Sequence, residues 1–111
     1  MDKLETYRTY VQNLLREYGA YKPSHGEVEV EQIIDPAHDH YQLVNVGWHG
    51  QRRIYGCFLH LDIINGKIWI QHNGLEDDIA EELVKMGAPK QDIVIGFHAP
   101  YKRQFTEYAV N

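Results

Sequence analysis

Histidine and acidic side chains that could hold a metal ion gather at one point of the sequence. His38, Asp39 and His40 are consecutive, and Asp35 precedes them by three residues. Imidazole and carboxylate groups are usual ligands of zinc and iron. Pro36 marks a turn at this point, however, and the sequence has neither a complementary cysteine set nor an HExxH pair to complete the ligands. We therefore interpret the run as solvated turn residues and expect no bound metal and no other cofactor.

A second group of side chains has the composition of an acid–base site. His60 and Asp62 alternate along an expected strand, with Gln71 across a hairpin and Tyr41 on the preceding strand, and a carboxylate can hold an imidazole in one tautomer. Same-face neighbours on a strand lie about 7 Å apart, too far for a direct hydrogen bond unless the side chains lean together. No nucleophile accompanies them, because strand alternation puts Cys57 on the opposite face and no GxSxG or glycine-rich phosphate loop is present. We therefore expect no enzymatic activity.

The balance of charge limits the partners that the chain can bind alone. The 111 residues include 16 acidic and 11 basic side chains, for a formal net charge of -5. DNA is bound through clustered cations, whereas the only basic pairs here are Arg52-Arg53 and Lys102-Arg103. Four such charges can assist a DNA-bound complex but are a weak sole source of affinity. We expect any DNA contact to occur only within a complex.

Cysteine usage and the N-terminal sequence indicate a compartment. The single cysteine, Cys57, cannot form an internal disulfide, which is typical of a reducing environment. The first residues include Asp2 and Glu5 and have no unbroken apolar core, so we expect neither a signal peptide nor a membrane span. We therefore expect a cytoplasmic protein with no membrane partner. Residues 22–26 have the composition of a linker.

Two segments have the periodicity of amphipathic helices. Apolar residues recur at three- and four-residue steps in the first, which should end near Gly19: Leu4, Tyr7, Val11, Leu14, Leu15 and Tyr18. The second begins with acidic residues and closes with Lys85 and Gly87, and its apolar residues are Ile79, Ala80, Leu83 and Val84. A short C-terminal turn of helix is expected from Pro100.

The remaining segments have the patterns of strands. Val28 and Val30 alternate with glutamates, as in an edge strand with one apolar face. Three longer strands are expected over residues 41–48, 54–64 and 67–73, and a short last strand over 93–97. The sheet should therefore be an antiparallel meander followed by a helix and one more strand.

Asn65-Gly66 between two apolar runs predicts a hairpin with a two-residue turn. The expected pairs are Ile64 with Lys67, Ile63 with Ile68, Asp62 with Trp69, Leu61 with Ile70 and His60 with Gln71. The face that should pack on the helices then carries Cys57, Leu59, Leu61, Ile63, Ile68 and Ile70.

The opposite face mixes aromatic and hydrogen-bonding side chains, as interfaces do. We predict that it binds a partner through Phe58, His60, Trp69 and Gln71, with Trp48 and Arg53 nearby. An uncovered aromatic face could also pair two copies of the chain. The alternative interpretation is that Trp69 and Phe58 only cover a second layer built by the C-terminal segment.

Several spaced motifs together resemble one protein family. In order, they are Asn65-Gly66-Lys67-Ile68-Trp69-Ile70-Gln71, a helix ending at Met86-Gly87, the segment 89–98 and the segment 106–110. Upstream, Tyr41-Gln42, Gly47-Trp48 and Arg53-Ile54-Tyr55 also fit. Together these motifs resemble the XisI family, the controlling factors for excision of the fdxN DNA element, over nearly the whole chain.

The resulting expectation is one α+β domain over residues 1–111, an antiparallel sheet of four to five strands with the N-terminal and central helices on one face. The resemblance implies a non-catalytic accessory factor in site-specific DNA excision. It would act with an XisH-like protein, and indirectly with a separate site-specific recombinase, and we expect a homo-oligomer. The alternatives are an antitoxin-like regulator of a nuclease-like XisH partner and a small DNA-binding protein.

Overall fold

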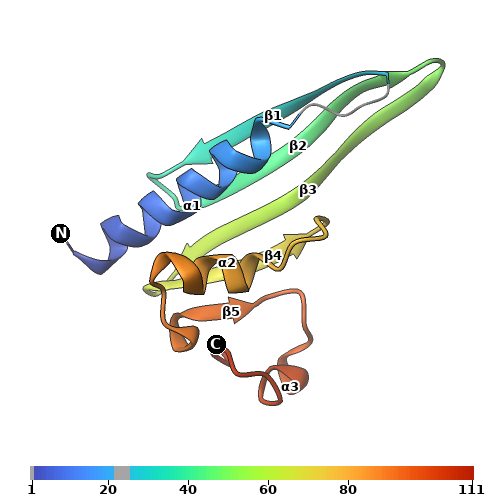
Figure 1. Cartoon of the computed structure of the whole chain (residues 1–111). Coiled ribbons are helices and arrows are strands. Elements are labelled where there is room, and N and C mark those ends of the chain that lie inside the picture. Colours follow the sequence, from blue (N-terminus) through green and yellow to red (C-terminus); the bar gives the residue numbers. More distant parts are fainter. Residues whose placement is uncertain (1, 22–25) are drawn as a thin grey trace.

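The computed structural model describes residues 2–21 and 26–111, so most of the linker-like stretch lies outside the described residues (Figure 1). The first helix, α1 (Lys3–Gly19), begins where Asp2 accepts a hydrogen bond from the Glu5 backbone N–H, and it ends as predicted. Its buried face carries Tyr7, Val11, Leu14, Leu15 and Tyr18. In the described part of the chain, no helix combines the length and the apolar character needed to cross a bilayer.

Five strands form one sheet in the order in which they occur in the chain. They are β1 (Glu27–Asp35), β2 (His40–His49), β3 (Arg52–Ile64), β4 (Lys67–Asn73) and β5 (Ile93–Ile95). The α+β architecture and the meander of the first four strands are confirmed. The last strand ends earlier than predicted, since residues 96–98 form a turn.

The fifth strand departs from the antiparallel arrangement that the sequence predicted for the sheet. Helix α2 (Ile79–Met86) and the short 3-10 helix η1 (Lys90–Asp92) connect β4 to β5, which pairs parallel to β4. A connection through a helix carries the chain back to the starting end of the sheet, so the next strand runs in the same direction. The chain then forms the short helix α3 (Pro100–Arg103), and Ala109 bridges to Val94.

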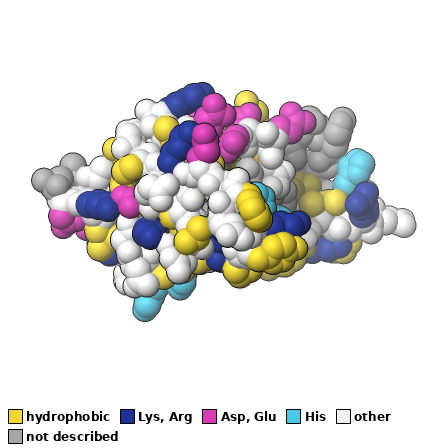
Figure 2. All heavy atoms as spheres, turned by 90° about the horizontal axis from the view of Figure 1, so that it is seen from below, with side chains coloured by type: hydrophobic (Ala, Val, Ile, Leu, Met, Phe, Trp, Pro, Cys, Tyr) yellow, Lys and Arg dark blue, Asp and Glu magenta, His cyan; other side chains and the backbone are white. Residues whose placement is uncertain are grey.

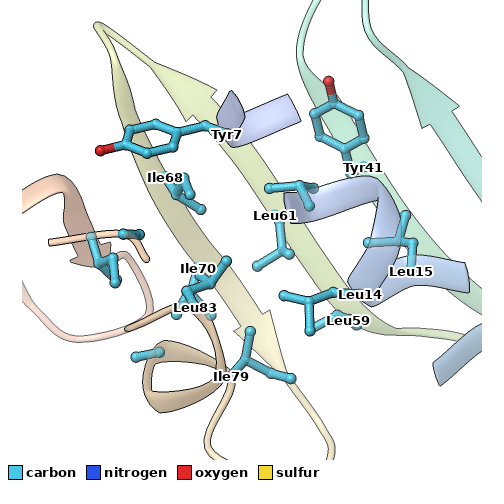
Figure 3. Packing of buried hydrophobic residues seen from close by; sticks show 14 of the residues in the cluster. Tyr7, Leu14, Leu15, Tyr41, Leu59, Leu61, Ile68, Ile70, Ile79 and Leu83 are labelled. Atoms are coloured by element: carbon cyan, nitrogen blue, oxygen red, sulfur yellow. The ribbon is translucent and has the colours of Figure 1, made fainter. Parts of the chain in front are cut away.

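Both long helices lie on the same side of the sheet (Figure 1). Helix α1 contacts β1, β2 and β3, and α2 contacts β4. Figure 3 shows the apolar side chains of both helices meeting those of the strands, including Leu59, Leu61, Ile68 and Ile70. We call this side the helix face and the other side the open face.

The Asn65-Gly66 turn has the predicted geometry, with φ of 51° and 76°, and four of the five predicted cross-strand pairs are present. The fifth pair is wrong, because His60 lies opposite His72 and Gln71 has no opposite residue. A β-bulge of this kind adds one residue to one strand and changes where its side chain points.

A second bulge overturns the predicted positions of Phe58 and Cys57. Leu43 pairs with Leu59 and Val44 with Cys57, so Phe58 is the extra residue of β3. Phe58 packs against the hydrophobic core on the helix face, not on the open face as predicted. Cys57 lies opposite Val44 and therefore on the open face, because directly paired residues share a face.

Tyrosine hydroxyls join the layers through aspartate carboxylates. Tyr18 of α1 donates to Asp77 before α2, at 2.7 Å, and Tyr7 of α1 donates to Asp92 at the end of η1. Asp92 also forms an ion pair with Lys3, with 2.6 Å between Lys3 Nζ and Asp92 Oδ2. These contacts tie α1 to elements that are distant in the sequence.

Gly47 is required where β1 lies close beside β2, opposite Val28. A Cβ atom at this position would lie 2.0 Å from the Glu27 carbonyl oxygen and 2.6 Å from the Val28 Cα, whereas one at Gly56 would meet nothing within 4 Å. We predict that Gly47→Ala lowers the free energy of unfolding by about 1–3 kcal/mol through overpacking. The matched Gly56→Ala should leave it unchanged or raise it by up to about 1 kcal/mol. Equal effects of the two substitutions in urea denaturation would contradict the close approach.

The carboxylate of Asp92 should make stability depend on acid pH. Burial alone would raise the pKa of Asp92, but hydrogen bonds from Lys3 and Tyr7 lower it below its ordinary value. Its contribution is therefore complete at neutral pH and is lost as pH falls from the unfolded value, about 3.9, through the lower folded value. We predict that Asp92→Asn destabilises the protein at pH 7 and that its deficit shrinks toward pH 3 in denaturant titrations. A deficit that does not change with pH would contradict this assignment.

Candidate functional site on the open face of the sheet

Paired positions on β2 and β3 place one row of side chains on the open face. From one end to the other the pairs are His40 with Asp62, Gln42 with His60, Val44 with Cys57, Val46 with Tyr55, and Trp48 with Arg53. The first two pairs are polar and the last two present aromatic side chains. The row therefore has two chemically different ends.

At the polar end, several side chains converge on one carboxylate. Asp62 Oδ1 lies 2.9 Å from His40 Nδ1 and 2.9 Å from His60 Nε2, and Gln71 Nε2 donates to Asp62 Oδ2 at 3.1 Å. Gln42 Nε2 lies 3.3 Å from His60 Nδ1. We call Asp62, His40, His60, Gln42 and Gln71 the Asp62 cluster.

Among the described residues, Asp62 is the one buried charged side chain, with 7% of its surface exposed. Burial alone would raise the pKa of Asp62, but hydrogen bonds from His40, His60 and Gln71, together with the charge of His60, lower it. The hydrogen bond between His40 and Asp62 raises the pKa of His40. The cluster thus keeps a carboxylate ionised inside the protein by surrounding it with donors.

The structure changes the predicted acid–base group in two ways. His60 and Asp62 lean together into direct contact, so the separation expected from strand spacing is overcome by side-chain orientation. Tyr41 is not part of the group, because it points into the helix face and donates to Asp39 at 2.9 Å.

The run from His38 to His40 does not form a metal-ligand set with its own neighbours. His38 contacts Asp35 at 2.9 Å, whereas Asp39 pairs with Arg8. His40 turns instead to the Asp62 carboxylate. The interpretation as turn residues holds for His38, but the sequence did not reveal the role of His40.

The sequence prediction also missed Gln42 as a member of the cluster. The sequence pattern that could have pointed to Gln42 is the alternation of His40 and Gln42 on β2, which matches the alternation of His60 and Asp62 on β3. Recognising this pattern required the register of the two strands.

The thiol of Cys57 lies on the same face but is not an activated nucleophile. Burial raises the pKa of Cys57, so the group remains a thiol at neutral pH, and its Sγ donates to the Leu59 carbonyl at 3.2 Å. A thiolate is the reactive form in nucleophilic catalysis. Cys57 therefore does not add a covalent step. The groups of the Asp62 cluster can exchange protons or bind a cation.

Trp69 is partly covered by the C-terminal segment. The Arg103 guanidinium lies 5.1 Å from the centre of the Trp69 ring and is held by the backbone oxygens of His98 and Gly96. The alternative interpretation of the sequence, that Trp69 covers a C-terminal layer, therefore describes its surroundings. Phe58 does not share them, because it packs on the helix face.

At the other end of the row, aromatic side chains are exposed. Trp48 is 49% exposed and Tyr55 is 73% exposed, and the Arg53 guanidinium stacks 5.3 Å from the Trp48 ring. We call Val46, Trp48, Arg53 and Tyr55 the Trp48 patch. It lies about 20 Å along β2 from the Asp62 cluster, at 3.4 Å per residue. Figure 2 shows hydrophobic side chains beside Lys and Arg on the molecular surface.

The six residues predicted to bind a partner are thus divided by the structure. His60 and Gln71 belong to the Asp62 cluster, and Trp69 lies beside it, opposite Asp62. Trp48 and Arg53 form the separate Trp48 patch, and Phe58 is on the helix face. Their role in binding a partner stays a prediction.

Comparison with known proteins identifies relatives of the whole chain. The XisI protein family model matches residues 1–110. The crystal structure of a XisI-like protein from Anabaena variabilis ATCC 29413 is 50% identical, with a TM-score of 0.92, and the match covers 97% of this chain and 99% of that one. The fdxN element excision controlling factor XisI from the same organism is 37% identical, with a TM-score of 0.87 and coverage of 99% and 100%. No curated protein matches. The chain belongs to the XisI family.

Proposed function

We propose that the protein is a non-catalytic accessory factor that controls excision of a DNA element by binding other proteins. The observation that carries the proposal is the match of the family over residues 1–110, together with a solved relative that is named an excision controlling factor. We place its action in the cytoplasm. Its partners would be an XisH-like protein and, indirectly, a site-specific recombinase.

The Trp48 patch is the surface that we propose for the protein partner. Helix α1, with 17 residues, is about 25 Å long, whereas the 13 residues of β3 extend about 44 Å. The β2–β3 hairpin therefore projects beyond both helices (Figure 1). Aromatic and arginine side chains dominate binding energy at protein interfaces, so Trp48, Tyr55 and Arg53 are suitable anchors.

The charge distribution favours protein partners over free DNA. The acidic excess gives a formal net charge of -5, which opposes a DNA backbone. Three glutamates of β1 border the open face, since Glu27, Glu29 and Glu31 pair with Trp48, Val46 and Val44. A partner with basic residues around an apolar centre would complement this surface. We propose that DNA is contacted only within the complex.

The proposal is tested by co-expression with an XisH-like protein, followed by mass determination of the purified complex without DNA. We expect a defined complex, and Trp48→Ala should weaken it by at least about 2 kcal/mol, as at interface hot spots. Tyr101→Ala, which removes an exposed aromatic ring from α3, should have no effect. Separate proteins, or tight binding of this chain alone to DNA at physiological salt, would contradict the accessory role. A complex that tolerates Trp48→Ala would move the interface elsewhere.

A further inference from the structure

The Asp62 cluster brings together three atoms of the kinds that bind transition metals. His40, His60 and Asp62 come from two adjacent strands, and each offers one ligand atom that lies within 4.8 Å of the other two. From this geometry we propose that the cluster is a binding site for a divalent first-row transition metal ion such as Zn²⁺ or Fe²⁺. The inference does not depend on the proposed function.

The separation of each imidazole nitrogen from the carboxylate oxygen is close to that of two ligands around one ion. Each imidazole nitrogen lies 2.9 Å from the same carboxylate oxygen. Adjacent ligands with bonds of about 2.1 Å lie about 3.0 Å apart in an octahedral site and about 3.4 Å apart in a tetrahedral one. Small rotations of the side chains would therefore admit the ion, while the strands stay in place.

The donor set also selects the class of metal. Two imidazoles and one carboxylate suit zinc and iron, and leave coordination positions open to water or another ligand. Magnesium and calcium prefer oxygen ligands, so they should bind poorly. In the metal-free protein the ring N–H groups donate to Asp62. To bind the ion, each of these nitrogens would give up its proton, to the other ring nitrogen of a neutral imidazole or to solvent from a protonated one.

The neighbours of the three ligands are arranged as an outer shell. Gln42 contacts the second ring nitrogen of His60, and Gln71 holds the second oxygen of Asp62. Rotation of the Gln42 amide would let its oxygen accept from His60 Nδ1–H once Nε2 binds the ion. Such outer contacts fix ring orientation at metal sites.

An ion can reach the cluster from solvent. The side chains of His40 and His60 are 59% and 28% exposed, whereas that of Asp62 is buried. Asp35 pairs with His40 across β1 and β2 and adds negative charge beside the entrance. The site is thus open on the side of His40 and closed below Asp62.

The test is calorimetric titration of the tag-free full-length protein with Zn²⁺ and with Mg²⁺. We expect one Zn²⁺ per chain and no saturable binding of Mg²⁺. His40→Gln and His60→Gln should each weaken Zn²⁺ binding by more than about 100-fold, since loss of an outer-shell contact alone costs 10–100-fold. Zn²⁺ should also raise the melting temperature of the wild-type protein with a dependence on its concentration.

The matched control is His38→Gln, which removes the histidine nearest in sequence to His40 but contacts only Asp35 among the described partners. Its Zn²⁺ affinity should equal that of the wild type. Absence of saturable Zn²⁺ binding would show that the cluster is a hydrogen-bond network only. Binding that survives both cluster substitutions, or that is lost equally in His38→Gln, would also overturn the site. Circular dichroism checks that each variant is folded. If His60→Gln unfolds the protein, the result for His40→Gln decides the test, because the His40 side chain is exposed.

Discussion

The structure depends on the burial of one face of a sheet whose side chains alternate. Leu59, Leu61 and Ile63 of β3 must face the helices, because burial of their apolar surface drives folding. Asp62, between Leu61 and Ile63, is thereby forced onto the open face, whatever its polarity. A carboxylate that loses water there needs hydrogen-bond donors, and His40, His60 and Gln71 supply them. The polar cluster is thus a consequence of the apolar core.

Two β-bulges modify this alternation and decide which residues face outward. The bulge at Phe58 turns that ring into the core and puts Cys57 beside Val44 on the open face. The bulge at Gln71 leaves this residue without an opposite residue on β3, and its side-chain amide donates to Asp62. Bulges commonly re-aim side chains near functional sites. Here the Phe58 bulge lies between the Asp62 cluster and the Trp48 patch, whereas the Gln71 bulge lies within the cluster.

The two regions place different chemical groups on one face of the sheet. The Trp48 patch offers aromatic area where the hairpin extends beyond the helices, whereas the Asp62 cluster offers directional polar groups where the sheet is broadest. Arg53 and Arg103 each stack on a tryptophan, one in the patch and one beside the cluster. Guanidinium groups in this position keep the rings accessible to polar partners while they reduce exposed apolar area.

The sequence by itself determined the helices, the Asn65-Gly66 turn, four of the five hairpin pairs and the family, because periodicity, turn conformation and motif order are local properties of the chain. Only the tertiary structure decided the parallel pairing of β5, the positions of Phe58 and Gln71, and the contact of His40 with Asp62. Each of these depends on the register between segments far apart in the sequence. A one-residue bulge reverses the outcome of alternation at little energetic cost, so the face of a side chain cannot be read from strand parity alone.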